Sequence, residues 1–293
     1  MQLGAVTLQN PICLAAASWH LDGPGYERLG AIFTRTVTME PKPGLYEQGI
    51  WQVADQTLLN ATNMRTENAE ILVQEHLPNL LRYGVPVLVS ITAPGIPGFR
   101  KIARFLKREA GGQIAGVEVY ITCTDTAKGA EITPKFVRDA TEAVRNELGP
   151  EAIIVVKLPP WPDFIRGLAL GAQEGGASAL AACNTLKGLH LPDDASAAPL
   201  IGGLSGEALR PVALRCVYEL AQDARIKLPI FGTGGIFTSN HVTDYLRVGA
   251  NAVQIASGEW LEPGLTARLA EECANDSQNA ARELSRANLV SRR

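Results

Sequence analysis

Eight short apolar segments are spread along the whole chain, and most of them end in residues that can do chemistry. Near-continuous apolar runs of this length are typical of strands buried on both faces of a parallel sheet. Helical patterns lie between most of them, the clearest at 67–83 and 205–224. The alternation predicts an α/β fold, specifically a (β/α)8 barrel. The eight segments are 10–16, 31–38, 86–93, 116–122, 153–159, 179–185, 228–234 and 252–258.

A doubly wound open sheet is the alternative architecture. Such a sheet usually carries a glycine-rich turn after its first strand, and residues 15–18 (AAAS) lack the GxGxxG pattern. A chain of 293 residues suits one barrel, and no repeat or linker divides it. We therefore predict a single barrel domain over residues 1–293. Two long connections, 39–60 and 186–204, are expected to be functional loops at the C-terminal face of the barrel.

The composition excludes several classes of protein. Hydrophobic residues make up 46% and charged residues 19%, which is typical of a folded chain with a large core. The net charge of −3 favours neither nucleic acid nor an anionic membrane as a partner. The chain has no long apolar run, so we expect no membrane-spanning helix, and its start lacks the basic residues of a signal peptide. Five cysteines lie far apart without a CxxC pair, which argues against zinc, an iron–sulfur cluster or a disulfide framework, and we therefore expect a reducing, cytoplasmic setting.

Glycines cluster at three expected strand ends in the second half of the chain. Glycine lets backbone N–H groups close around an anion, and barrels frequently bind phosphate after strands seven and eight. The cluster therefore predicts a phosphate site, although glycines of this kind can also simply make tight turns. The residues are Gly202 and Gly203 before the expected helix at 205, Gly234 and Gly235 after the seventh segment, and Ser257 and Gly258 after the eighth.

Two cations and one amide stand out within apolar segments. Lys157 lies inside IIVVKLPP and Arg35 inside FTRTVT. Burying an unpaired ammonium is costly, so Lys157 is expected to touch an anionic cofactor or an electron-rich ring, unless it reaches water at the barrel rim. Asn184, beside Thr185, closes the sixth segment, where an amide could donate to and accept from a planar ligand or cap a turn.

Cys123 ends the fourth segment and is followed at once by the polar residues 124–126. A thiol exposed at a strand end can act as a base or a nucleophile. The alternative is that it simply packs, as we expect of Cys13, Cys183 and Cys216.

Taken in order, these segments resemble the dihydroorotate dehydrogenase family, barrel flavoproteins that carry FMN. GVEVYITCTD resembles the catalytic strand of that family, usually E-x-N-x-SCPN, and NPICLAAAS resembles its opening NP-x-x-x-A-S-G segment. The motifs GGLSG and NTLKG are most similar to those of the class 1B branch of that family. Further matches, all in register, are GAIFTRTVTMEPKPG, IIVVKLPP, GGLSGEALRPVALR, GTGGI and GANAVQIASG.

The resemblance implies a role for each matching position. Cys123 would be the base that takes a proton from the substrate carbon while hydride passes to flavin N5. Lys157 would contact the flavin ring and ribityl region, and Arg35 stands where the family usually has a lysine. Ala16 and Ala17 would lie under the flavin. The phosphate would be held by Gly202, Gly203, Gly234, Gly235, Ser257 and Gly258.

The expected substrate site departs from the family pattern. The asparagines of that site are replaced by Tyr120 and Asp125 in the catalytic strand, and by Thr66 at the end of the segment 60–66. A carboxylate at Asp125 disfavours an anionic ligand such as orotate, unless Arg35 pairs with it. The residues expected to bind the cofactor therefore mostly keep the family pattern, whereas those expected to bind the substrate depart from it. The substrate-binding set implied by the resemblance is Asn60, Thr66, Tyr120, Asp125, Asn184 and Thr185.

We therefore expect an FMN-dependent oxidoreductase acting on a C–C bond next to a carbonyl, with dihydroorotate as the default substrate. One alternative is a reductase of uracil or thymine resembling dihydropyrimidine dehydrogenase. Another is a flavin-binding barrel that has lost catalysis. The resemblance also implies a homodimer and a separate electron-transfer subunit.

Overall fold

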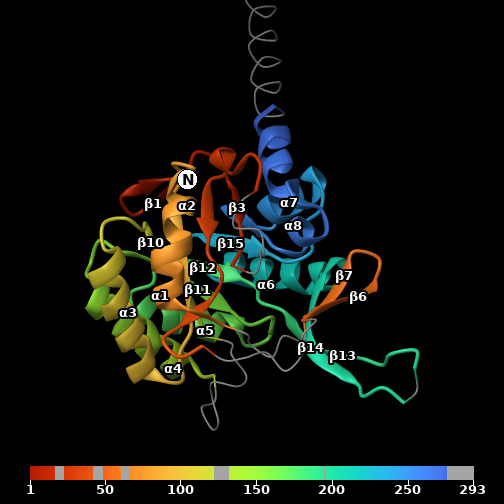
Figure 1. The fold of residues 1–293 in the computed structure, drawn as a ribbon, viewed down its shortest axis with the longest axis horizontal. Coiled ribbons are helices and arrows are strands. Elements are labelled where there is room, and N and C mark those ends of the chain that lie inside the picture. The colour runs from red at the N-terminus through yellow and green to blue at the C-terminus, as the bar shows by residue number, and fades with distance from the viewer. Residues whose placement is uncertain (17–22, 42–48, 61–65, 122–131, 195, 276–293) are drawn as a thin grey trace, which may run out of the picture.

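Eight parallel strands close into a ring at the centre of the protein (Figure 1). The computed structural model describes residues 1–16, 23–41, 49–60, 66–121, 132–194 and 196–275. The ring closes because β16 pairs with β3 and β9 pairs with β10, which makes it a barrel and not an open sheet. The predicted (β/α)8 fold is thereby confirmed. The strands, in ring order, are β3 (Ile12–Leu14), β4 (Ala31–Phe33), β9 (Val87–Ile91), β10 (Gly116–Tyr120), β11 (Ile153–Leu158), β12 (Ala179–Ala182), β15 (Ile230–Thr233) and β16 (Ala252–Ile255).

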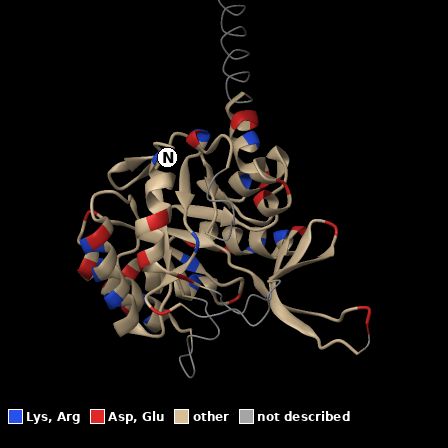
Figure 2. Ribbon diagram, viewed as in Figure 1, with Lys and Arg blue, Asp and Glu red and all other residues tan. Residues whose placement is uncertain are grey.

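Helices cover the outside of the ring, and the charged side chains lie mostly on them and on the loops (Figure 2). Two short strands, β5 (Val37–Thr38) and β8 (Glu67–Asn68), extend the sheet beside β9. None of the helices in the described ranges combines the length and the apolar character needed to cross a membrane. The helices are η1 (Tyr26–Arg28), α1 (Ala69–Ile71), η2 (Leu72–His76), α2 (Leu77–Leu81), α3 (Ile96–Ala110), α4 (Pro134–Leu148), α5 (Ile165–Glu174), η3 (Glu207–Leu209), α6 (Arg210–Gln222), α7 (Ser239–Arg247) and α8 (Ser257–Leu261).

The helix expected at 67–83 is continuous over 69–81 but changes its hydrogen bonding in the middle. The segment η2 is a π-helix, placed between two α-helical pieces. Because a π turn rotates the side chains that follow it, apolar residues spaced for an α-helix do not stay in one line. Leu72 and Leu80 are fully buried, whereas Ile71 is 42% exposed.

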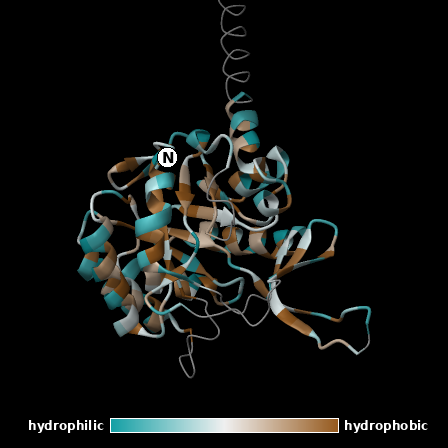
Figure 3. Ribbon diagram, in the orientation of Figure 1, coloured by the Kyte–Doolittle hydropathy of each residue, from teal (hydrophilic) through white to brown (hydrophobic). Residues whose placement is uncertain are grey.

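The barrel interior changes from apolar to polar along its axis. A hairpin of β1 (Gln2–Leu3) and β2 (Val6–Thr7) covers the N-terminal end, where Leu3 packs in the same cluster as Ile153 at the start of β11. Further along, Phe33 and Phe231 meet edge to face, with ring centroids 5.5 Å apart. The strands themselves are strongly hydrophobic (Figure 3).

Polar side chains replace the apolar ones two positions further along the same strands, because side chains alternate between the two faces of a strand. Ser90 follows Leu88 in this way, and Lys157 follows Val155. Glu118, Thr233 and Gln254 occupy equivalent positions and are all buried. The C-terminal end of the barrel interior is therefore lined with groups that can form hydrogen bonds.

The two long connections pair with each other in a four-stranded antiparallel sheet. Its order is β13 (Leu186–His190), β14 (Leu200–Gly206), β7 (Thr57–Asn60) and β6 (Ile50–Ala54). The sheet projects away from the barrel (Figure 1). Since β14 joins segments from after the second and sixth barrel strands, the sheet fixes these two connections relative to each other.

The expected start of the helix at 205 is wrong. Ser205 does not cap a helix but lies in β14 opposite Leu58, and the chain becomes helical only at Glu207. Gly202 and Gly203 are likewise in β14, paired with Gly188 and Lys187, and not in a turn before a helix. Pairing with β7 and β13 satisfies the backbone of this stretch as a strand, which a pattern local to the sequence does not reveal.

The interior aromatic pair generates a prediction about stability. Phe231→Ala should lower the free energy of unfolding by about 3–5 kcal/mol, because it opens a cavity against Phe33 in the middle of the barrel. Phe164→Ala is the control, since Phe164 is 71% exposed and should change that free energy by less than about 0.5 kcal/mol. Urea unfolding measures both. Equal effects of the two variants would contradict the packing described for Phe231.

Candidate active site

A small pocket lies at the C-terminal end of the barrel, where active sites of this fold are found. It is enclosed by residues from β11 and from the ends of β12, β15 and β16. Its lining includes Lys157, Asn184, Thr233, Gly234, Gln254 and Ser257. The pocket thus brings together predicted site residues that are up to 100 positions apart in the sequence.

Three glycines from different connections meet beside this pocket. Gly235 has a φ of +63°, and a Cβ placed on it would lie 2.7 Å from the carbonyl oxygen of Gly206. A Cβ on Gly258 would lie 2.5 Å from the carbonyl oxygen of Ile236. Only glycine permits such close approach of backbone to backbone. The glycine of β14 that meets the later turns is therefore Gly206, at the end of the strand, whereas Gly203 faces Thr185 and Gly202 pairs with Gly188.

Lys157 lies at the pocket wall and is 5% exposed, so it does not reach water at the rim. Its Nζ lies 3.5 Å from Oε1 of Glu118, a fully buried carboxylate on the neighbouring strand. The pairing offsets the cost of burying either charge alone. An ammonium has three donors, and this contact uses one of them.

Sequence reasoning missed Glu118, although the signal was present. The argument that singled out Lys157, a charge within an apolar strand, applies equally to the glutamate in GVEVYIT. Glu118 also accepts hydrogen bonds from Ser90 Oγ at 3.1 Å and from Gln254 Nε2 at 2.9 Å. Gln254 and Thr233, the latter donating to Gln254 Oε1 at 3.0 Å, were missed as well.

Two of the predicted substrate residues are joined directly. Asn184 Nδ2 donates to the hydroxyl of Tyr120 at 2.7 Å, which links the end of β12 to the end of β10. Thr66 is buried, and its hydroxyl lies 2.8 Å from that of Thr38. Asn60 ends β7 opposite Gly203.

Of the remaining predicted residues that the structure describes, one lines the pocket and the others are not among its lining residues. Thr185 lines it, and its hydroxyl lies against Gly203. Ala16 is 6% exposed in the interior cluster, and Arg35 is half-buried between β4 and β5. Ala17, Cys123 and Asp125 lie outside the described residues.

The three cysteines predicted to pack are buried, as expected. Burial raises the pKa of Cys13 to about 12. A hydrogen bond with Cys216, together with burial, raises the pKa of Cys183 well above its ordinary value. Cys183 nevertheless forms part of the pocket wall, with its Sγ 3.9 Å from the carbonyl oxygen of Thr233. Cys13 and Cys183 are therefore protonated at neutral pH and poor nucleophiles.

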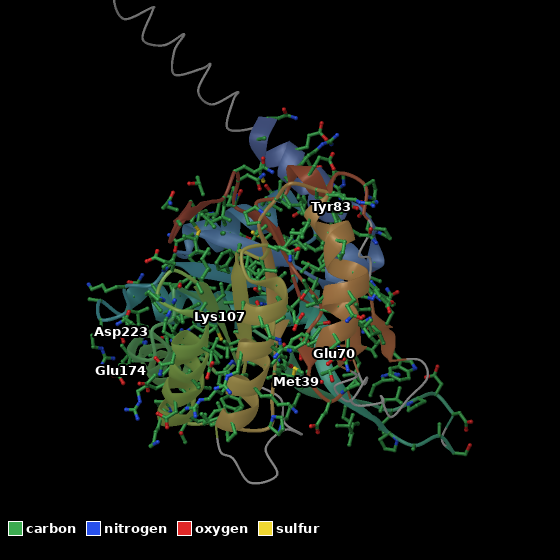
Figure 4. All side chains as sticks on the ribbon, turned by 60° about the vertical axis from the view of Figure 1, so that its left-hand side comes forward. Met39, Glu70, Tyr83, Lys107, Glu174 and Asp223 are labelled. Atoms are coloured by element: carbon green, nitrogen blue, oxygen red, sulfur yellow. The ribbon has the colours of Figure 1, made fainter. Side chains whose placement is uncertain are left out.

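A second hollow lies on the outer surface, where Met39 and Glu70 face the helix that carries Lys107 (Figure 4). Four cations of α3 line it, but carboxylates neutralise several of them. Lys101 Nζ lies 3.5 Å from Glu40, and Arg104 forms two hydrogen bonds to Glu147. This hollow has none of the buried polar groups that the barrel pocket has.

Comparison with known proteins identifies the family. The family model described as dihydroorotate dehydrogenase matches residues 2–275. This chain belongs to the dihydroorotate dehydrogenase family. It is 34% identical, over 93% of this chain and 91% of the relative, to the dihydroorotate dehydrogenase B (NAD(+)) catalytic subunit of Maridesulfovibrio salexigens (strain ATCC 14822 / DSM 2638 / NCIMB 8403 / VKM B-1763). It is 32% identical to the protein of the same name from Desulforudis audaxviator (strain MP104C), over 92% and 89% of the two chains.

A solved structure supports the same architecture. The dihydroorotate dehydrogenase of Eimeria tenella, crystallised with ferulenol, superposes with a TM-score of 0.75 at 20% identity. The match covers 96% of this chain and 84% of that one, and at this identity it establishes the fold alone. The resemblance to the dihydroorotate dehydrogenase family, read from the motifs, is confirmed by the family model and by the relatives.

The dihydroorotate dehydrogenase family is flavin-dependent, and the described residues suit such a cofactor. The glycine turns at Gly234, Gly235 and Gly258 lie in or beside the pocket, and backbone N–H groups in turns of this kind can bind a phosphate. Lys157 supplies a cation at the wall of the same pocket. Within the described ranges, no group of three or more His, Cys, Asp or Glu side chains could hold a metal ion.

Proposed function

We propose that this chain is an FMN-dependent dehydrogenase that acts on a CH–CH group next to a carbonyl, with dihydroorotate as the default substrate. The observation that carries the proposal is the pocket at the C-terminal end of the barrel, where Lys157 and the glycine turns meet. Membership of the dihydroorotate dehydrogenase family supports the same chemistry. On this proposal the barrel over residues 1–293 is a single FMN-binding unit.

The residues of the chain have separate tasks in this proposal. The backbone at Gly234, Gly235, Ser257 and Gly258 holds the phosphate, with Gly202 and Gly203 contributing from β14. Ala16, Ala17 and Arg35 complete the cofactor site, and Lys157 presents its ammonium to the pocket. FMN, when bound, would supply the hydride acceptor for a substrate whose C–C bond becomes double. Cys123 takes the proton from the neighbouring carbon, so that two electrons and one proton leave with the hydride and the second proton goes to the thiolate.

The electrons must then leave the site. Several similar proteins are named catalytic subunits of dihydroorotate dehydrogenase B (NAD(+)), which supports a separate electron-transfer subunit for this chain. A homodimer of the barrel is part of the same proposal.

A second candidate is reduction of an uncharged pyrimidine, and one contact favours it. The amide of Asn184 already donates to Tyr120, so it is committed to the protein on that side. Asp125, two residues after Cys123 in the sequence, would add a carboxylate that repels an anionic ligand unless Arg35 neutralises it. Substrate panels of dihydroorotate, uracil and thymine separate the two candidates.

The cofactor assignment predicts a yellow protein that holds FMN without a covalent bond. Hydrogen bonds to charged groups contribute about 1.5–3 kcal/mol, so Lys157→Ala should weaken FMN retention by roughly tenfold or more. Lys187→Ala is the control, because Lys187 is exposed on β13. FMN binding is measured by fluorescence titration of the flavin-free protein. A folded but colourless protein that takes up no FMN would refute the assignment.

The proposed base predicts a kinetic effect without loss of cofactor. Cys123→Ala should retain FMN but slow substrate-driven flavin reduction by about 10²–10⁴-fold, the usual contribution of general acid–base catalysis. Cys273→Ala, in the helical stretch 265–275 and outside the pocket lining, should leave the rate unchanged. Single-turnover stopped-flow absorbance of the flavin reports both. If the two variants behave alike, Cys123 has no special role.

The replacement of the family's asparagines in the expected substrate site predicts weak binding of orotate. Each unmatched polar contact costs on the order of 1–3 kcal/mol, and the hydroxyl of Thr66 and the amide of Asn184 already face protein groups. Titration of the oxidised flavin spectrum should therefore show little response to orotate. Tyr120→Asn, which releases the Asn184 amide, should strengthen binding. Tight stoichiometric binding of orotate by the unaltered protein would make this interpretation wrong.

A further inference from the structure

Glu118 occupies a distinctive place beneath the pocket. It is fully buried and does not belong to the pocket lining, yet two of its three hydrogen-bond partners, Lys157 and Gln254, do. Gln254 in turn accepts from Thr233, which also lines the pocket. Glu118 therefore does not contact a ligand in the pocket, but it can act on one through its charge and through the side chains that it holds.

The hydrogen bonds around Glu118 have defined directions. An ionised carboxylate can only accept, and here Oε1 accepts from Ser90 and Lys157 while Oε2 accepts from Gln254. Since Ser90 gives its single hydroxyl proton to Glu118, the 3.0 Å contact between Ser90 and Thr36 has Thr36 as donor. Gln254 is fixed as well, because its carbonyl accepts from Thr233 and its amide donates to the carboxylate. The hydrogen bonds from Ser90, Lys157 and Gln254 therefore all end on the carboxylate of Glu118.

We infer that Glu118 is a positioning residue that balances the charge of Lys157 and thereby sets the reduction potential of the flavin bound in the pocket. The inference rests on the proposed function, since it requires a flavin there. Lys157 is the one charged side chain among the described residues that line the pocket, and Glu118 is its recorded ion-pair partner. Together they present a pair of zero net charge to the ligand instead of a lone cation.

The sign of the effect follows from electrostatics in a poorly solvated site. A positive charge stabilises the electron-rich reduced ring and raises the reduction potential, whereas a negative charge lowers it. Glu118→Gln leaves the cation unbalanced and should raise the potential. Lys157→Met leaves the carboxylate unbalanced and should lower it. The double variant removes both charges, so its potential should lie between those of the two single variants.

The test is the midpoint potential of the flavin in the purified holoprotein, measured by dye equilibration for the unaltered protein and the three variants. Ser90→Ala is the matched control, because it removes one hydrogen bond to Glu118 but no charge, and its potential should match that of the unaltered protein. A potential for Glu118→Gln equal to or below that of the unaltered protein overturns the inference. If Glu118→Gln does not fold, the double variant still decides: a potential equal to that of Lys157→Met overturns the inference, and a higher one supports it.

Thermal unfolding of the flavin-free protein tests the pairing without the cofactor. Breaking a buried ion pair destabilises more than removing both partners, so the double variant should lose less in Tm than the sum of the two single variants. Additive losses show that the two charges are not coupled and overturn the inference. An unaltered protein that retains no flavin, by contrast, refutes the proposed function, while the Tm comparison still reports on the pair.

Discussion

Closure of the barrel is the constraint on which the rest of the structure depends. Hydrogen bonding between the last strand and the first, including Ala15 N to Ile255 O at 2.9 Å, joins the two halves of the ring. Because all eight strands are parallel, closure places their C-terminal ends around one opening. The side chains that line the pocket, such as Lys157 and Ser257, come together for this reason and not through any local contact.

Along the barrel axis, the interior changes from apolar layers that stabilise the fold to a polar layer next to the pocket. Alanines and the Phe33–Phe231 pair fill the first layers, and these side chains are buried. Two positions further along, the same strands carry Ser90, Glu118 and Gln254, whose polar atoms bond to one another. A buried charge is tolerable at this level because its partners arrive on neighbouring strands held in fixed register.

The antiparallel sheet ties the connections around the pocket into one unit. β14 pairs with β7 on one side and with β13 on the other, and it then leads through Gly206 into the helix behind the pocket. The backbone of Gly206 contacts the turn at Gly235, so the position of the antiparallel sheet and that of the turn after β15 depend on each other. Close backbone packing of this kind leaves little freedom for side chains at these positions, which explains why glycine occupies them.

The sequence by itself determined the strand–helix alternation, the positions of all eight barrel strands, the family and Lys157 as a buried cation. The strands follow from apolar periodicity and Lys157 from the cost of burying a charge, while the family is read from motifs that stand in order along the chain. Tertiary structure decided the features that depend on pairing between distant segments. Residues 200–206 became a strand because β7 and β13 lie beside them, and the partner of Lys157 proved to be Glu118, 39 positions earlier in the chain. A sequence shows which groups need a partner, but only the closed barrel decides which partner is within reach.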